Sequence, residues 1–177
     1  MREAKYLDFP IAEYRRRYEC LQDSMATDGF DALLLTSRDN VEYLTGFTTP
    51  SWRLTPNRCW VAVLAGRDPV LFLHPTHEAN ATATSWVEDV RLWGSGGRDN
   101  LDLVSDLFRA VGAGVGKVGM ELGSGTVLKM SIREYEGLRQ RLPEADFVDA
   151  EYALGRARWV KSPLEIERLA RACAITE

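Results

Sequence analysis

The chain has 177 residues with 45% apolar side chains, which is enough for one domain with a hydrophobic core and too much for a disordered chain. Its 22 basic and 26 acidic residues give a net charge of −4 without long runs of one sign, so we expect neither a nucleic-acid partner nor an anionic membrane surface. No apolar run approaches the ~20 residues of a membrane span, and the charged first residues do not resemble a signal peptide.

The first predicted element is a helix that begins near Pro10 and ends at Gly29. Proline suits the first turn of a helix, and glycine is a common C-terminal stop. Between them, apolar residues recur at steps of three and four, at Ile11, Tyr14, Tyr18, Leu21 and Met25. The arginine triplet 15–17 is interpreted as part of the solvated face of this helix.

The stretch that follows, residues 31–47, is the one around which we expect the fold to be organised. Its continuous apolar run 32–35 predicts a strand buried on both faces. Asp39 or Asn40 is expected to cap a helical turn after the strand, and Gly46 to end that turn with a positive φ.

A loop and a hairpin come next. Residues 48–58 contain two prolines and no periodicity, which indicates a loop. Strands are predicted at 59–65 and 70–73, and the tight turn between them favours an antiparallel hairpin. A short helix capped by Thr76 and an edge strand at 87–93 follow.

The second half of the chain alternates helices with short strands. Helices are predicted at 101–111, capped by Asp99 or Asn100, and from a capping box at Ser131 and Glu134 up to Pro143. The apolar stripe of this later helix comprises Ile132, Tyr135, Leu138 and Leu142. Short strands are predicted at 117–121 and 147–148.

Two helical segments close the chain. Residues 150–156 are predicted to be helical, and residues 162–165 (SPLE) form a capping box that starts a last helix. Its apolar residues are Leu164, Ile166, Leu169, Ala170 and Cys173. Because no cap follows before Glu177, we expect a fragment of a longer protein. The element order predicts an α/β fold, with a mixed, mostly parallel sheet of about six strands, one hairpin and flanking helices.

The residues do not indicate a complete enzyme. The motif at 114–119 (GVGKVG) has dinucleotide-site spacing, but it follows a helix and enters a strand, the reverse of the required order. His74 and His77, with Glu78, could bind a metal, although no cysteine or carboxylate pair accompanies them, and capping or surface roles are preferred.

The three cysteines, Cys20, Cys59 and Cys173, are odd in number and far apart, so we expect reduced thiols in a cytoplasmic protein. Cys59 and Cys173 lie in apolar patterns and are predicted to be core residues. No G-x-S-x-G elbow is present.

The loop 48–58 is the strongest candidate for a binding site. Arg53 and Arg58 could clamp a carboxylate, and Trp52 could cover an apolar group. The alternative left open is a loop whose tryptophan packs on its own domain.

Three segments together resemble the N-terminal domain of the creatinase/prolidase family, the Xaa-Pro peptidases or "pita-bread" metallohydrolases. These segments are residues 14–25 together with 29–35, residues 40–47 (NVEYLTGF) and residues 158–166 (RWVKSPLEI). The resemblance implies a small α/β domain with a ribonuclease H-like motif at residues 1–157, followed at 158–177 by a linker and the first helix of a catalytic domain.

The resemblance also implies a function. It identifies a non-catalytic domain of a metal-dependent Xaa-Pro dipeptidase, aminopeptidase or creatinase-like hydrolase. A pair of divalent metals (manganese, zinc or cobalt) would lie in the catalytic domain, and no cofactor is expected in this chain. The domain would support a homodimer, and its loop would reach the pocket for a small peptide or amide. By this analogy Trp52 and Arg53 are the first candidates for substrate contact, followed by Arg58.

Two competing hypotheses remain. One is a free-standing α/β interaction or small-ligand-binding module, for which a capped last helix would be expected. The other is catalysis within this chain at His74, His77 and Glu78, for which stoichiometric metal in the purified chain would be expected.

Overall fold

The sheet is built around β1 (Ala32–Leu35), which pairs antiparallel with β2 (Trp60–Leu64) and parallel with β5 (Lys117–Met120). The computed structural model of the chain describes residues 4–53, 58–94 and 97–176. The six strands run in the order β4-β3-β2-β1-β5-β6, completed by β3 (Val70–Leu73), β4 (Asp89–Leu92) and β6 (Asp146–Asp149). Three pairings are parallel and two are antiparallel, so the predicted mixed sheet with one hairpin is confirmed.

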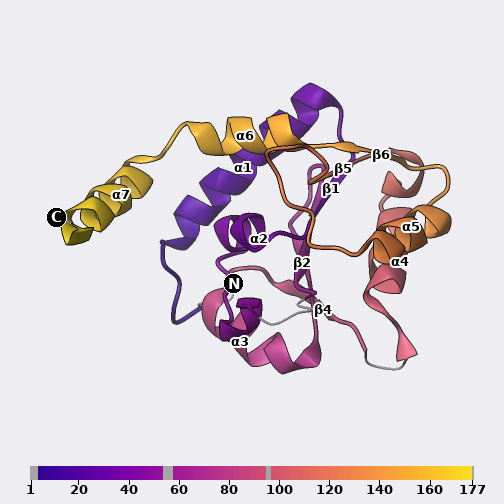
Figure 1. Ribbon diagram of the computed structural model, residues 1–177, viewed down its shortest axis with the longest axis horizontal. Coiled ribbons are helices and arrows are strands. Elements are labelled where there is room, and N and C mark those ends of the chain that lie inside the picture. The colour runs from indigo at the N-terminus through magenta and orange to yellow at the C-terminus, as the bar shows by residue number, and fades with distance from the viewer. Residues whose placement is uncertain (1–3, 54–57, 95–96, 177) are drawn as a thin grey trace.

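Helices cover both faces of this sheet (Figure 1). One layer contains α1, α2, α3 and α6, and the other contains α4 and α5. The helices are α1 (Ile11–Asp28), α2 (Arg38–Thr45), α3 (Glu78–Thr84), α4 (Asn100–Ala110), α5 (Ile132–Arg141), α6 (Glu151–Trp159) and α7 (Pro163–Thr176).

The residues of β1 divide between the two layers as a pleated strand requires. Leu33 and Leu35 face α1 and α2, whereas Ala32 and Leu34 face α4, and all four side chains are fully buried. The prediction of a strand buried on both faces is therefore confirmed, and β1 connects the two halves of the hydrophobic core.

Most helix ends follow the predicted signals. Gly29 ends α1 at φ 69°, Asp99 caps α4, and Ser131 and Glu134 form a capping box at α5. Two caps were predicted wrongly. Ser37, not Asp39 or Asn40, caps α2, because its Oγ accepts from the backbone N–H of Asn40 at 3.3 Å.

The second wrong cap is Thr76, which donates its backbone N–H to His74 Nδ1 at 3.3 Å instead of starting a helix. Two burial predictions are also wrong: Ile132 is 79% exposed, and Cys173 is exposed rather than in the core.

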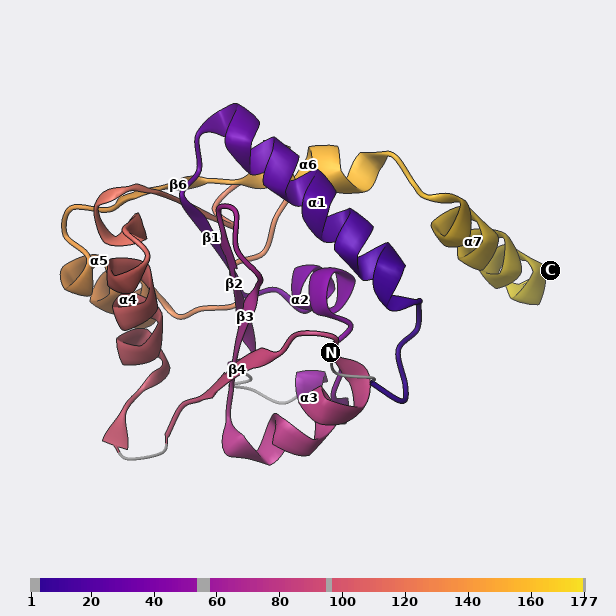
Figure 2. The same ribbon diagram turned by 180° about the vertical axis from the view of Figure 1, so that it is seen from behind.

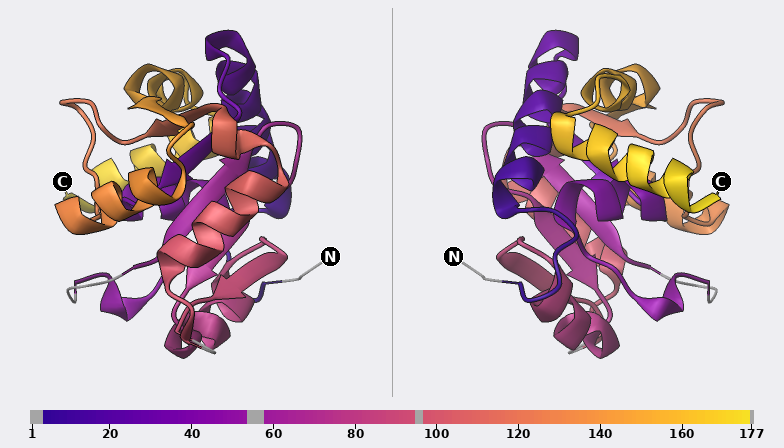
Figure 3. Two further views of the ribbon diagram at one scale, coloured as in Figure 1. Left: turned by 90° about the vertical axis from the view of Figure 1, so that its right-hand side faces the viewer. Right: turned by 90° about the vertical axis from the view of Figure 1, so that its left-hand side faces the viewer.

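The last helix projects away from the rest of the molecule. Figures 1 and 2 show α7 running outward beyond α6, and the right-hand view of Figure 3 shows this yellow helix in front of the rest of the chain. Its apolar residues Leu164, Ile166 and Leu169 are 38%, 57% and 53% exposed. No helix in the described ranges is long and apolar enough to cross a membrane.

Candidate functional site

The chain leaves α2 at Gly46, and this residue sets the direction of the loop that follows. Gly46 has φ 70°, and a Cβ at this position would lie 2.8 Å from the carbonyl oxygen of Thr84. Glycine is the residue that satisfies both conditions without strain. Phe47 is fully buried, so the loop starts from a fixed point in the core.

Thr49 ties the first turn of the loop to the segment that contains α3. Its Oγ1 accepts from the Asn80 side-chain amide at 3.1 Å and from the Ser51 backbone N–H at 3.2 Å. It also lies 3.4 Å from His77 Nδ1. These contacts hold the loop backbone at the point where the 3₁₀ turn Pro50–Arg53 begins.

Trp52 and Arg53 point to different surroundings. The Trp52 indole packs edge-to-face on Phe47, with 5.7 Å between ring centroids, and is partly buried. Its N–H is buried and has no acceptor among the described residues. Arg53 is exposed, and no ion pair or hydrogen bond of its side chain occurs within the described ranges. Trp52 thus packs on its own domain, with Arg53 exposed beside it.

Arg58 is directed toward α5 instead. Its guanidinium forms an ion pair with Glu134 and lies 5.7 Å from the centroid of the Trp93 ring. Burial raises the pKa of Glu134, but hydrogen bonds from Ser131 and the charge of Arg58 outweigh this and hold the pKa below its usual range. Among the described residues, no hydrogen bond, ion pair or ring contact joins Arg58 to Trp52, and the interactions of Arg58 are with Glu134 and Trp93.

His74 and His77 contact side chains of their own part of the fold. His74 Nδ1 lies 2.9 Å from Thr76 Oγ1, and its ring packs on Trp93 at 4.8 Å between centroids. His77 packs on Phe47, and burial lowers its pKa. Across the described ranges, no three His, Cys, Asp or Glu side chains gather in a way that could hold a metal ion. The described residues therefore offer no metal site, and the metal pair that the resemblance implies was expected in the catalytic domain.

A buried carboxylate that the sequence analysis missed lies at the N-terminus of α2. Glu121 follows β5 and is 1% exposed. Its Oε2 accepts from Thr36 N at 2.7 Å, Thr36 Oγ1 at 2.8 Å and Ser37 N at 2.9 Å. Its Oε1 accepts from the Asn40 amide at 2.6 Å. The charge of Glu121 is thus placed where the α2 dipole favours an anion.

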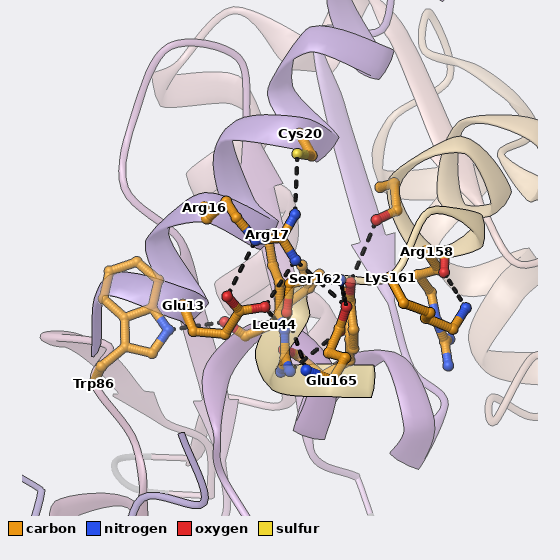
Figure 4. A network of polar contacts seen from close by, with 12 residues as sticks. Glu13, Arg16, Arg17, Cys20, Leu44, Trp86, Arg158, Lys161, Ser162 and Glu165 are labelled. Atoms are coloured by element: carbon orange, nitrogen blue, oxygen red, sulfur yellow. Dashed lines mark hydrogen bonds and ion pairs between the residues drawn. The ribbon is translucent and has the colours of Figure 1, made fainter. Parts of the chain in front are cut away.

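A second group of missed residues connects α1 with α7 (Figure 4). We call Glu13, Arg16, Arg17 and Glu165 the junction cluster. Arg17 Nε lies 3.3 Å from a Glu13 oxygen and Arg17 Nη2 lies 3.2 Å from a Glu165 oxygen, with Arg17 3% exposed. Glu165 also accepts from the Ser162 backbone N–H at 2.8 Å, which confirms the predicted capping box.

The same arginine is enclosed by aromatic rings. The Arg17 guanidinium carbon lies 4.2 Å from the Phe9 ring centroid and 4.4 Å from that of Tyr43. The interpretation of the arginine triplet as a solvated face is therefore wrong for Arg17. The signal was present, because position 17 lies within the stripe of Tyr14, Tyr18 and Leu21.

Burial and charge shift the pKa values of groups in this region. Burial raises the pKa of Glu13, but hydrogen bonds from Arg16 and Ser162 and the charges of Arg16 and Arg17 outweigh it, so the pKa falls below its usual range. Burial, followed by the nearby Glu165 charge, raises the pKa of Tyr43 to about 12. Glu13 is thus anionic and Tyr43 neutral at physiological pH.

Comparisons with known sequences place this geometry in context. The family model described as "Creatinase/Prolidase N-terminal domain" matches residues 17–160. An uncharacterized hydrolase/peptidase, y4tL of Sinorhizobium fredii, is 30% identical over 178 residues, which cover 96% of this chain and 44% of that protein. The ectoine hydrolase of Halomonas elongata is 28% identical over 169 residues, which cover 91% of this chain and 41% of that protein. The chain spans less than half the length of these relatives.

Solved structures agree with the sheet and helix arrangement. Dipeptidase PepE from Mycobacterium ulcerans superimposes with a TM-score of 0.72 at 23% identity, covering 94% of this chain and 42% of that chain. The N-terminal domain of the cytoplasmic peptidase PepQ from Mycobacterium tuberculosis gives a TM-score of 0.61 at 25% identity. The match covers 80% of this chain and 98% of that chain. The latter was crystallised as an N-terminal domain, so a domain of this fold exists as an independent structure.

Proposed function

Because the chain belongs to the family of creatinase/prolidase N-terminal domains, we propose that it is the non-catalytic N-terminal domain of a metal-dependent hydrolase that cleaves a peptide or small amide bond. The observation that carries the proposal is the family match over residues 17–160. The relatives described as peptidases or hydrolases support the class of reaction. Metal ions would be held by the catalytic domain, and we assign no catalytic step to this chain.

Within this proposal, the loop 48–58 contributes to substrate binding. Trp52 supports the loop from below, because its ring packs on the buried Phe47. Arg53 is exposed beside it and presents a planar guanidinium that suits a substrate carboxylate. Arg58 has a secondary role, because it must exchange its ion pair with Glu134 for a substrate group.

The proposal further includes a cytoplasmic homodimer formed through this domain. The support for the dimer is the family resemblance. The cytoplasmic location is supported by the PepQ relative, which is described as a cytoplasmic peptidase. Sedimentation of the full-length protein over a range of concentrations tests the dimer, and a monomer throughout would overturn that part.

The test of the loop is Arg53→Ala in the full-length protein, assayed on Xaa-Pro dipeptides and small amides. Loss of a charge-assisted hydrogen bond should raise KM about tenfold or more, with kcat nearly unchanged. The matched control is Arg133→Ala, which removes an exposed arginine on α5. An unchanged KM in the first variant rejects the role of Arg53. Absence of any peptide or amide hydrolysis by the unmodified protein rejects the proposed activity.

A further inference from the structure

Three large apolar side chains, in the first turn of α6 and at its C-terminal end, are uncovered. Tyr152 is 71% exposed, Trp159 63% and Val160 79%, and we call these three residues the outer stripe. Tyr152 and Trp159 are seven residues apart, which places them on one face of the helix. The opposite face of α6 packs on α1 through Ala153, Leu154 and Ala157.

Gly155 leaves room for the Trp159 indole to lie against the helix. A Cβ on Gly155 would lie 2.5 Å from Cζ2 and 2.7 Å from Cε2 of the ring, so the indole lies directly on the helix surface. Glycine inside a helix costs about 1 kcal/mol relative to alanine. Within the described part of the chain, no aromatic ring stacks on Trp159 and no hydrogen bond involves its N–H. An exposed indole that lies against its own helix is of the residue type most common at the centre of protein interfaces.

The surroundings of the indole also fit a docking surface. Trp159 borders a hollow of about 420 Å³ between α6 and the segment after β5, where Val127 is 57% exposed. Four charged side chains line the same hollow, namely Asp39, Glu151, Arg158 and Lys161. An apolar centre with a polar rim is typical of protein interfaces.

We propose that the outer stripe is the surface on which the polypeptide that follows this domain rests in the full-length protein. Three observations favour this occupant. The family is that of N-terminal domains, and the chain spans 44% and 41% of its two relatives, so more than half of each relative is available to cover the surface. The stripe ends at Val160, three residues before α7 begins at Pro163. The junction cluster fixes the direction of α7 through Glu165.

The size of the stripe is sufficient for such a role. Tyrosine and tryptophan each bury about 150–250 Å² when they are covered. The exposed Ile166 and Leu169 of α7 add further apolar surface. The inference rests on the proposed function only in requiring that the domain is part of a longer protein, and it does not depend on the reaction that this protein catalyses.

Hydroxyl-radical footprinting of the 177-residue chain and of the full-length protein tests the inference. We expect oxidation of Tyr152 and Trp159 to be at least about fivefold slower in the full-length protein, because contact removes both rings from solvent. Ile132, 79% exposed on α5 in the other helix layer, serves as an internal control for radical dose. Equal oxidation of Trp159 in both proteins overturns the inference.

The outer stripe could instead be covered by a second copy of the chain. Two further experiments, dilution and the variant Trp159→Ser, distinguish this possibility. Protection that disappears on dilution of the full-length protein, or that the 177-residue chain acquires on concentration, overturns the inference in favour of self-association.

Trp159→Ser should leave the melting temperature of the 177-residue chain unchanged and should accelerate proteolysis of the full-length protein between residues 158 and 163 severalfold. Because peptide hydrolysis is not a readout, failure here is distinguishable from failure of the proposed function.

Discussion

Arg17 meets Glu165 between α1 and α7, with 3.2 Å between Arg17 Nη2 and a Glu165 carboxylate oxygen. The two side chains are 4% and 8% exposed. Desolvation offsets most of the attraction in such a buried pair, so it adds little net stability. Its effect is geometric, because the contact ties the first turn of α7 to a buried side chain of α1.

Arg17→Met should destabilise the chain strongly. The substitution removes the fully buried guanidinium and leaves the carboxylates of Glu13 and Glu165 with the half-buried Arg16 as their remaining partner. Removing one partner of a buried ion pair costs about 3–5 kcal/mol. The control is Arg15→Met in the same arginine triplet, where the exposed side chain lies over Trp86 and should cost less than about 1 kcal/mol. Urea unfolding of both variants measures the difference, and equal losses would contradict the special position of Arg17.

Glu121→Gln should also be destabilising, despite its small change in shape. The carboxylate accepts four hydrogen bonds, and an amide nitrogen in place of either oxygen cannot accept. At least one buried donor then loses its partner, at a cost of about 1–3 kcal/mol. Glu136→Gln on the exposed face of α5 is the control, with an expected change within about 0.5 kcal/mol. A Glu121 variant that unfolds like this control would reject the capping role.

The features that could be predicted from the sequence differ from those that could not in the distance along the chain over which they act. Among the described residues, local signals located the strands and the α-helices, because apolar periodicity, glycine stops and capping boxes act over a few residues. The long-range polar contacts were not predictable in this way. Glu121 caps a helix that lies 81 to 85 residues earlier in the chain, and no local rule relates two such positions.

The candidate site shows the same limit. The loop 48–58 was singled out by its composition, and the packing of Trp52 on Phe47 was one of the two interpretations left open. The ion pair of Arg58 with Glu134 depends on the placement of α5 across the sheet, which the sequence alone does not provide. Arg17 was misplaced because a charged residue within an apolar stripe was assigned to the solvated face.

The stability of the chain should decrease in acid, in a window set by Glu13 and Glu134. The folded-state pKa of each carboxyl is below its ordinary value of 4.5. The unfolded chain therefore binds protons first, so the free energy of unfolding is at its full value above pH 4.5 and falls as the pH decreases through the folded-state pKa values. Urea midpoints measured across this range should show the decrease.

The control for this pH dependence is the variant Glu13→Gln. It should be less stable at neutral pH, because a buried partner of Arg17 is lost, and it should lose less stability than the unmodified chain on acidification. A profile with unchanged slope would show that Glu13 does not contribute to the acid transition.

Gly46→Ala should destabilise the chain more than the same substitution at Gly66. Both residues have positive φ, at 70° and 67°, so both variants lose about 1–2 kcal/mol to backbone strain. A Cβ at Gly66 meets open space, whereas one at Gly46 lies 2.6 Å from Leu7 and 2.8 Å from the Thr84 carbonyl oxygen. The difference between the two variants in urea unfolding measures the close approach alone, and equal losses would contradict it.

The thiols should react in an order set by burial. Cys59 is fully buried, and burial raises its pKa to about 12, so its reactive thiolate form is scarce at pH 8. Cys173 is exposed and Cys20 is half-buried. N-ethylmaleimide should therefore modify Cys173 first, Cys20 more slowly, and Cys59 only when the chain unfolds. Peptide mapping after labelling in increasing urea should show Cys59 modification following the global transition. Modification of Cys59 at the rate of Cys173 in buffer would mean that β2 opens without global unfolding.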